Sequence, residues 1–451
     1  MKTLVACVVL VTFSARLASG QPADLKSIAR QSLAKLDGDF NVPGVREPVE
    51  IIRDKWGVTH IYAKNEADLF FAQGYVAAQD RLWQLYMWRM EHEGRLSEIL
   101  GPAAFARDRE TRLLMFRGPF DDKEWTSYHP HGKAIFTAFA NGVNAYITQN
   151  DNLPVEFKLT GLKPDLWKPE TPLLRVAGMG DANAELTLAR LVARVGVKEA
   201  TKQHLWDPWS EIVVPPGLDV NAIGANVTAG RGGRGGLPKP AILPKYLPLL
   251  QALLSGELAE DDIKEPGSNN WVIGGKYTVT GKPIVSNDPH RPVTNPSLRY
   301  IFHLVAPGWN VIGSQEAPFV GVALGHNERV AWGLTITGTD QTDTFVEEVN
   351  PANPNEVKYK GAWEPLKIVH EEIKIRPLRR SHRTDASTRL SRSDNRSPSE
   401  SCPRNRRLPL LFLQVPWIRA DPHRSDRRWN TRRPRRCRTG PCPARMPEAP
   451  N

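Results

Sequence analysis

The chain of 451 residues has almost no cysteine outside its two ends. One of its four cysteines lies near the start and three lie beyond residue 400 (Cys7, Cys402, Cys437 and Cys442). A disulfide framework and a cysteine-based metal site are therefore excluded for the body of the protein. The chain also lacks, after its first residues, any apolar run of the roughly 18–20 residues that a membrane-spanning helix needs. We therefore expect no membrane partner.

Residues 1–20 have the features of an export signal. Lys2 supplies positive charge, residues 4–13 form an apolar run, and small residues at 18–20 suit signal cleavage. Arg16 is atypical so close behind the apolar run, and a short buried N-terminal helix is the alternative. The pattern favours export, to a periplasm or out of the cell.

Positive charge is concentrated in one tail. Residues 377–451 contain 19 Arg and no Lys against six acidic residues, whereas the preceding part has a net charge of −2. Since Lys and Arg are balanced up to residue 376, the abrupt loss of Lys favours a reading-frame shift in the gene over a genuine disordered tail. The tail lacks the interleaved aromatic residues of a nucleic-acid-binding segment, so no nucleic-acid partner is expected.

Composition divides the rest of the chain into three regions. Helical periodicity dominates residues 21–225, whereas residues 226–267 are rich in Gly, Arg and Pro and predict an exposed spacer. Residues 268–376 contain short apolar runs broken by turn residues, which is typical of strands. Helices in one region and strands in another predict an α+β protein whose strands stack as two antiparallel sheets.

Periodicity also places the individual elements. Helices are expected at 24–36, over 66–100 and in several segments of 119–205. Asp80 and Arg81 are expected to pair charges between helices. Strands are expected at 48–54, 57–63, 271–273, 277–279, 284–286, 300–305, 311–312 and 320–324. The large aromatic residues expected in the helical core are Trp125, Trp167 and Trp206.

The most informative motif is Gly267-Ser268-Asn269-Asn270-Trp271. Gly267 offers no side-chain obstruction, so the Ser268 hydroxyl could attack the peptide bond that precedes it. The cut would leave Ser268 as a new N-terminus whose α-amine, with a pKa of roughly 7.7–8, can serve as its own base. The motif therefore suggests a self-activating serine nucleophile.

Together with Gly325-His326-Asn327 and Trp332-Gly333, this motif resembles the penicillin acylase family of N-terminal nucleophile hydrolases. The resemblance covers about residues 45–376 and ends at about 377. It implies a four-layer αββα sandwich, left incomplete because most of the β-subunit is missing. Residues 21–225 would correspond to the α-subunit and 268–376 to the start of the β-subunit. In the family, the spacer between them is removed, which gives an α/β heterodimer.

The resemblance also implies catalytic roles. Ser268 would be the nucleophile, and His290 matches the position where members with a cephalosporin-type preference carry an imidazole that could hydrogen-bond the serine. Ile336 matches the family's backbone oxyanion donor, a role that any side chain allows. The second family donor, an Asn side chain farther along the β-subunit, has no equivalent in the tail.

A structural Ca²⁺ site is implied by the same resemblance. Glu185, Asp340, Thr342 through its carbonyl, and Asp343 match family ligands, and such hard oxygen donors suit Ca²⁺. A solvated acidic turn is the alternative for Asp340 and Asp343. No organic cofactor is expected.

The expected substrate is a small amide. Arg291 and Leu324 stand where penicillin G acylases place aromatic rings of the acyl pocket, and a cation there argues against a phenylacetyl group if it points inward. The resemblance implies hydrolysis of the side-chain amide of β-lactams or of N-acyl-homoserine lactones. The alternative is a truncated, catalytically inactive homologue, which we expect to be poorly soluble.

Overall fold

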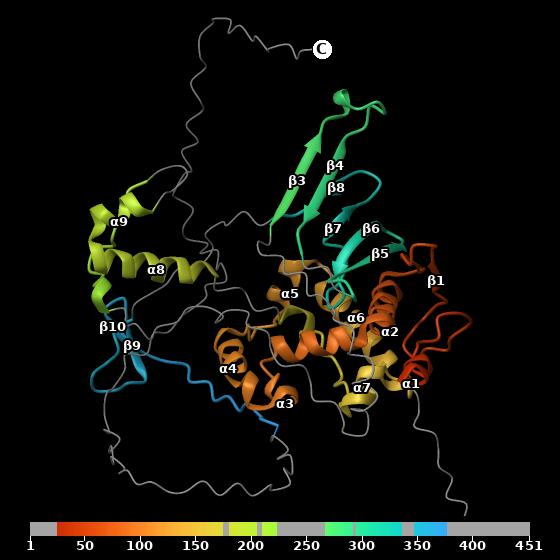
Figure 1. Ribbon diagram of the computed structural model, residues 1–451, viewed down its shortest axis with the longest axis horizontal. Helices are drawn as coiled ribbons and strands as arrows, with labels where there is room; N and C mark the ends of the chain where they lie inside the picture. Colours follow the sequence, from red (N-terminus) through yellow and green to blue (C-terminus); the bar gives the residue numbers. More distant parts are fainter. Residues whose placement is uncertain are drawn as a thin grey trace, which may run out of the picture.

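The computed structural model describes residues 25–174, 180–204, 210–222, 267–291, 295–335 and 347–376 (Figure 1). The expected signal sequence, the spacer up to residue 266, Trp206 and the Arg-rich tail lie outside these ranges. The described residues combine a helical layer with three separate sheets, so the predicted α+β class is confirmed. The four-layer arrangement stays a prediction.

A six-stranded sheet forms the centre of the fold, in the order β1-β2-β5-β6-β7-β8 (Figure 1). Neighbouring strands are antiparallel except β2 and β5, which are parallel. The expectation of purely antiparallel sheets is therefore wrong at this pair. A long stretch of chain, not a hairpin turn, connects β2 to β5, so the connection does not dictate their relative direction. The strands are β1 Glu50–Arg53, β2 Thr59–Tyr62, β5 Arg299–Ala306, β6 Trp309–Glu316, β7 Leu324–His326 and β8 Ala331–Trp332.

Strand β5 shows why one face of this sheet is buried. Its side chains alternate, as those of a strand with one covered face should. Phe302 and Leu304 are completely buried and Tyr300 nearly so, whereas Ile301 on the opposite face is 46% exposed. The buried side chains join one core cluster with residues of the helices. The core therefore lies between this face and the helical layer.

The helical layer is built around α2 and α6, which pack closely against each other. Asn65 caps the N-terminus of helix α2, and its side-chain oxygen accepts from the Asp68 N–H, as expected of a good N-cap. Trp125 and Trp167 are 2% and 5% exposed, which confirms them as core residues. The helices are α1 Leu25–Gln31, α2 Glu66–His92, α3 Ser97–Leu100, α4 Phe105–Leu114, α5 Asp122–Tyr128, α6 Gly132–Gln149, α7 Val155–Thr160, α8 Gly180–Val195 and α9 Val197–Gln203.

Glycines allow α2 and α6 to meet backbone to backbone. A Cβ atom added to Gly142 would lie 2.8 Å from the Tyr75 nitrogen and nearer still to the Phe71 carbonyl oxygen. A Cβ atom on Gly74 would likewise overlap the Phe139 backbone. Each helix therefore supplies one glycine to the crossing.

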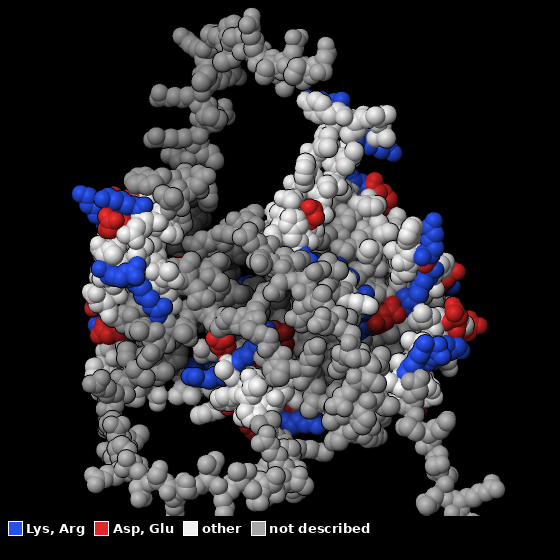
Figure 2. All heavy atoms as spheres, in the orientation of Figure 1, with Lys and Arg blue, Asp and Glu red and all other residues white. Residues whose placement is uncertain are grey.

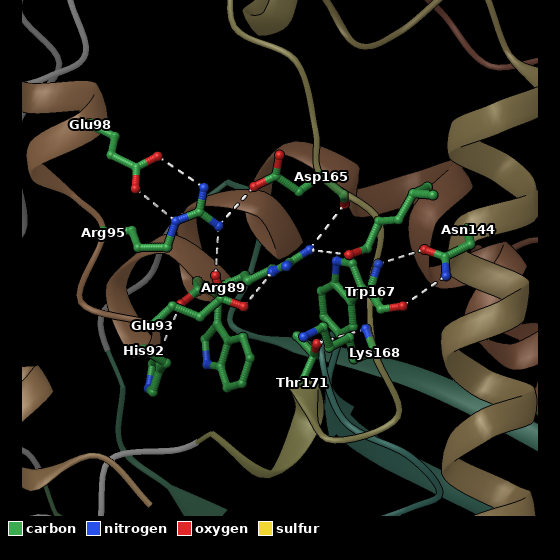
Figure 3. A network of polar contacts seen from close by, with 12 residues as sticks. Arg89, His92, Glu93, Arg95, Glu98, Asn144, Asp165, Trp167, Lys168 and Thr171 are labelled. Atoms are coloured by element: carbon green, nitrogen blue, oxygen red, sulfur yellow. Dashed lines mark hydrogen bonds and ion pairs between the residues drawn. The ribbon is translucent and has the colours of Figure 1, made fainter. Parts of the chain in front are cut away.

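A polar network fastens the segment before η2 (Thr171–Leu173) to the end of α2 (Figure 3). Arg89 donates to the carbonyl oxygens of Asp165 and Leu166 at 3.1 and 2.7 Å and pairs with Glu93 at 2.7 Å. The Asn144 side chain, on α6, exchanges two hydrogen bonds with the Trp167 backbone. These bonds satisfy backbone groups that regular secondary structure would otherwise pair.

Asp80 has a structural role, but not the predicted one between helices. Its carboxylate accepts from Arg53 of β1 at 2.9 and 3.0 Å and from the Tyr300 hydroxyl of β5. Arg81, where α2 departs from helical geometry, lies over the Tyr300 ring at 5.5 Å. Both charges therefore connect a helix to strands.

Two short hairpins lie outside the central sheet. One pairs β3 Ser268–Ile273 with β4 Ile284–Pro289, and the other pairs β9 Glu356–Tyr359 with β10 Ala362–Pro365. The strand expected at 277–279 is wrong, because Gly275–Tyr277 form a 3₁₀ turn at the tip of the first hairpin. The strand expected at 320–324 is also mostly wrong: only Leu324 belongs to β7, since Gly321 adopts φ +80° in the preceding turn.

Charges of both signs are interspersed over the described surface in the view of Figure 2. This distribution agrees with the near-neutral charge of the chain up to residue 376. Every helix among the described residues is too short or too polar to cross a membrane.

Candidate active site

Ser268 opens strand β3 of the hairpin that projects from the body of the fold (Figure 1). The register pairs Ser268 with Pro289 and Asn269 with Asp288, so the motif around the serine faces the Asn287-Asp288-Pro289-His290 segment. Ser268 is half-buried. The antiparallel pairing thus brings His290, 22 residues beyond Ser268, beside the Gly267–Ser268 bond.

The carbonyl that the serine would attack is already hydrogen-bonded. The His290 backbone N–H donates to the Gly267 carbonyl oxygen at 2.8 Å. An N–H in this position stabilises negative charge that develops on the oxygen when a nucleophile adds to the carbon. The intact chain therefore has one backbone N–H donor on the carbonyl group between residues 267 and 268.

The Ser268 hydroxyl lies against a threonine. Ser268 Oγ is 2.5 Å from Thr335 Oγ1, and Thr335 Oγ1 also donates to the Ser268 carbonyl oxygen at 3.2 Å. At this distance the two hydroxyls form a short O–H···O hydrogen bond, which holds the serine hydroxyl against Thr335. Thr335 is therefore a functional candidate that the sequence alone did not single out.

The His290 side chain belongs to a small polar group with Asp288 and Asn269. Its Nε2 is 3.2 Å from Asp288 Oδ2 and 3.3 Å from Asn269 Nδ2, and Asn269 Nδ2 donates to the same carboxylate oxygen at 3.4 Å. The pKa of the Asp288 carboxyl group lies below its ordinary value of 3.8, and the hydrogen bond from His290 is the main cause. The expected hydrogen bond from His290 to Ser268 stays a prediction.

Asn287 ties the segment that carries Thr335 to the hairpin. Its amide donates to the carbonyl oxygens of Asn269 and Leu334 at 2.9 and 3.0 Å, and its Oδ1 accepts from the Leu334 N–H at 3.2 Å. A Cβ atom on Gly333 would lie 2.6 Å from the Asn287 Cβ, so a side chain at 333 would force the two segments apart. Asn287 and Gly333 thereby set the distance between Thr335 and the serine.

The contacts of the two predicted substrate-binding residues, Arg291 and Leu324, do not connect them to a pocket. Arg291 donates from Nη1 to the His290 carbonyl oxygen at 2.8 Å, and Leu324 is half-buried at the start of β7. A hollow of about 160 Å³ lies on the hairpin against Trp271 and Ile273, and neither Arg291 nor Leu324 lines it. A larger hollow of about 760 Å³ lies among α2, α5 and α6, and its lining does not include Ser268.

The oxyanion and calcium predictions depend mostly on residues that the structure does not describe. Ile336, Asp340, Thr342 and Asp343 lie outside the described ranges. Glu185 is half-buried on α8. Within the described ranges, no cluster of three or more His, Cys, Asp or Glu side chains is placed to hold a metal ion.

An intact glycine–serine bond with a hydroxyl beside it and a donor on its carbonyl defines a candidate self-cleaving serine site. The sequence model of the Penicillin amidase family matches residues 48–392. The match ends 16 residues beyond the limit expected from the motifs, inside the Arg-rich tail. Because it covers well over half of the chain, the chain belongs to the penicillin amidase family.

Individual relatives point to two kinds of acylase. The chain is 30% identical over 351 residues to penicillin acylase 2 proenzyme of Pseudomonas sp. (strain SE83), a match that covers 76% of this chain and 43% of the relative. It is 29% identical over 364 residues to the acyl-homoserine lactone acylase QuiP of Pseudomonas aeruginosa, over 77% of this chain and 40% of the relative. The matched region spans about two fifths of the length of these relatives.

Among solved structures, a thermostable penicillin G acylase from Alcaligenes faecalis is 24% identical, with a TM-score of 0.30. The superposition covers 38% of this chain and 97% of that chain. A score this low supports no conclusion about the fold.

Proposed function

We propose that the chain is the precursor form of a penicillin acylase-type amidohydrolase, which cleaves its own Gly267–Ser268 bond. Ser268 Oγ adds to the Gly267 carbonyl carbon, the peptide bond breaks, and an ester forms that water then hydrolyses. The observation that carries the proposal is the hydrogen bond of 2.8 Å from the His290 N–H to the Gly267 carbonyl oxygen, beside a hydroxyl held by Thr335. The family assignment supports it.

After cleavage, Ser268 would act on substrates through the same hydroxyl. Its α-amine would serve as base, the hydroxyl would attack an amide carbonyl, and water would release the acid from the acyl-enzyme. Ile336 would supply a backbone oxyanion donor. The relatives' names favour the side-chain amide of β-lactams or N-acyl-homoserine lactones as substrates.

Further features belong to the same proposal. Cleavage and trimming of the spacer would give an α/β heterodimer, and residues 1–20 would direct it to the periplasm or out of the cell. A structural Ca²⁺ would be held by Glu185, Asp340, Asp343 and the Thr342 carbonyl, whose hard oxygen donors suit this ion.

Cleavage is tested on the purified chain by intact-mass measurement and N-terminal sequencing. We expect a new N-terminus at Ser268, none in Ser268→Ala, and slower cleavage in Thr335→Val, which removes the hydroxyl partner. Ser286→Ala, an exposed serine on the partner strand, is the matched control and should cleave like the parent chain. Cleavage of Ser268→Ala at the same bond would refute Ser268 as the nucleophile.

Substrate class is tested on the cleaved protein. Phenylacetyl and glutaryl amides of β-lactams and N-acyl-homoserine lactones are incubated in parallel, and the released amine is measured. Turnover of one class that Ser268→Ala abolishes would assign the substrate. Turnover that persists in Ser268→Ala would contradict the mechanism.

A further inference from the structure

Asp288 occupies a position that the motifs did not assign to any task, beside the imidazole of His290. We propose that Asp288 is a positioning residue: it holds His290 in the tautomer that leaves Nδ1 unprotonated and directed at Gly267, where Nδ1 acts as a base in self-cleavage. The inference rests on the proposed function of the Gly267–Ser268 bond and names a further step of it.

The contacts of Nε2 select the tautomer. A carboxylate only accepts hydrogen bonds, so Nε2 must carry the proton to bond with Asp288 Oδ2 at 3.2 Å. An unprotonated Nε2 would place its lone pair against the carboxylate. The Asn269 amide then donates to Asp288, at 3.4 Å, and not to the imidazole. One carboxylate thus accepts from both neighbours, and the second ring nitrogen stays unprotonated in the neutral imidazole.

The other ring nitrogen faces the cleavage site. A Cβ atom added to Gly267 would lie 3.2 Å from His290 Nδ1, which is tighter than most Cβ contacts. The ring is also fixed through its own backbone, because the His290 N–H donates to the Gly267 carbonyl oxygen. Gly267 therefore lies between a backbone donor that binds its oxygen and His290 Nδ1, which lies on the side where a Cβ atom would stand.

This placement suits hydrolysis of the ester that follows serine attack. A water oxygen bonds to the Gly267 carbonyl carbon while Nδ1 takes one of the water protons. The bond from that carbon to Ser268 Oγ then breaks, and the proton on Nδ1 is transferred to Oγ. The products are the Gly267 carboxyl group and Ser268 with its free hydroxyl and α-amine. A base positioned in this way typically contributes about 10²–10⁴-fold in rate.

Among the described residues, two charged side chains contact His290. Asp288 is the carboxylate in contact with it, and the Arg291 guanidinium binds the His290 carbonyl oxygen at 2.8 Å. Side chains of Asp288 and His290 are 60% and 43% exposed, so an isosteric substitution at 288 should leave the fold intact.

The tautomer is measured directly by ¹⁵N NMR of histidine-labelled protein, in the Ser268→Ala chain, whose bond stays intact. We expect His290 to be protonated at Nε2 at neutral pH, and to populate both tautomers when Asp288→Asn is added. Asp54→Asn is the matched control, because Asp54 lies 3.8 Å from His60 in another Asp–His pair. It should leave the His290 signals unchanged. Protonation of His290 at Nδ1, or no response to Asp288→Asn, would overturn the proposal.

A second readout uses chains that keep Ser268. Asp288→Asn should slow cleavage about 10-fold or more, and hydroxylamine, which attacks the ester without a base, should restore it. Hydroxylamine should not rescue Ser268→Ala, which forms no ester. If cleavage is slow and hydroxylamine does not accelerate it, the substitution impairs the formation of the ester and not its hydrolysis. That result would overturn the role of Nδ1. If the parent chain does not cleave at all, the proposed function fails, and the NMR result still decides the role of Asp288.

Discussion

Replacing Gly142 with alanine should destabilise the protein, although alanine is the better helix former. Gly142 lies inside α6, where the exchange would gain about 1 kcal/mol from helix propensity alone. The opposing effect is steric. The new methyl group would overlap the Phe71 carbonyl and lie 2.8 Å from the Tyr75 nitrogen, both of them backbone atoms of α2.

The steric cost should exceed the gain. Backbone atoms cannot rotate away as a side chain can, so α2 and α6 must separate and loosen the core between them. Overpacking of a well-packed core costs typically about 1–3 kcal/mol, and occasionally more. Since Phe139 is fully buried beside the crossing, we place the cost at the upper end of that range. The net loss should be about 2 kcal/mol, or a fall in Tm of about 4–8 °C.

Thermal unfolding, followed by near-ultraviolet circular dichroism, measures the effect. Asn141→Ala is the matched control, because Asn141 is exposed and precedes Gly142 in the same helix. It should stabilise the protein by about 0.5 kcal/mol through propensity. A Gly142→Ala protein with a Tm equal to or above that of the parent chain would show that the helices do not meet at their backbones.

Two further predictions concern charged groups. Asp80→Ala should lower the free energy of unfolding by about 2–3 kcal/mol, because it leaves the buried Tyr300 hydroxyl without its carboxylate. In denaturant titrations, the exposed Asp151→Ala control should change it by less than about 0.5 kcal/mol. The pKa of Asp288 should rise toward 3.8 in His290→Ala, since the histidine is the main cause of its depression. A depressed folded-state pKa stabilises the protein above the ordinary carboxyl pKa, and this contribution is lost as the pH falls through the depressed value. Carboxyl ¹³C NMR that shows the same midpoint in both proteins would contradict the contact.

Local patterns in the sequence predicted the elements that depend on neighbours in the chain. The hairpin of β1 and β2 and the start of α2 follow from alternation and from helical spacing within short windows. The parallel pairing of β2 with β5 follows from neither, because its partners are far apart in the chain. The error at residues 320–324 has a similar cause: an apolar run predicts a strand, but the turn at Gly321 interrupts it.

The candidate site likewise contains contacts that the sequence predicted and contacts that it did not. The hairpin pairing that brings His290 to Gly267 connects two segments of one motif region, so their proximity was predictable. Thr335 lies 67 residues from the serine, and an isolated hydroxyl carries no motif. Asp288 lies two residues before His290, and extended chain places such side chains on one face, but the contact between the carboxylate and the imidazole is seen only in the structure.

The parallel pair of β2 and β5 has a consequence for the order of events in maturation. It joins Thr59–Tyr62 to residues 302–305, on either side of the proposed cut. While the chain is continuous, the residues between these strands tether them to each other and so give each strand an effective concentration around its partner. Cleavage removes the tether, so a denatured mature enzyme would have to reassemble its central sheet from two separate molecules. The central sheet would thus form efficiently only before the cut. At high dilution the uncut chain would refold after denaturation, whereas the two cleaved chains would not find each other.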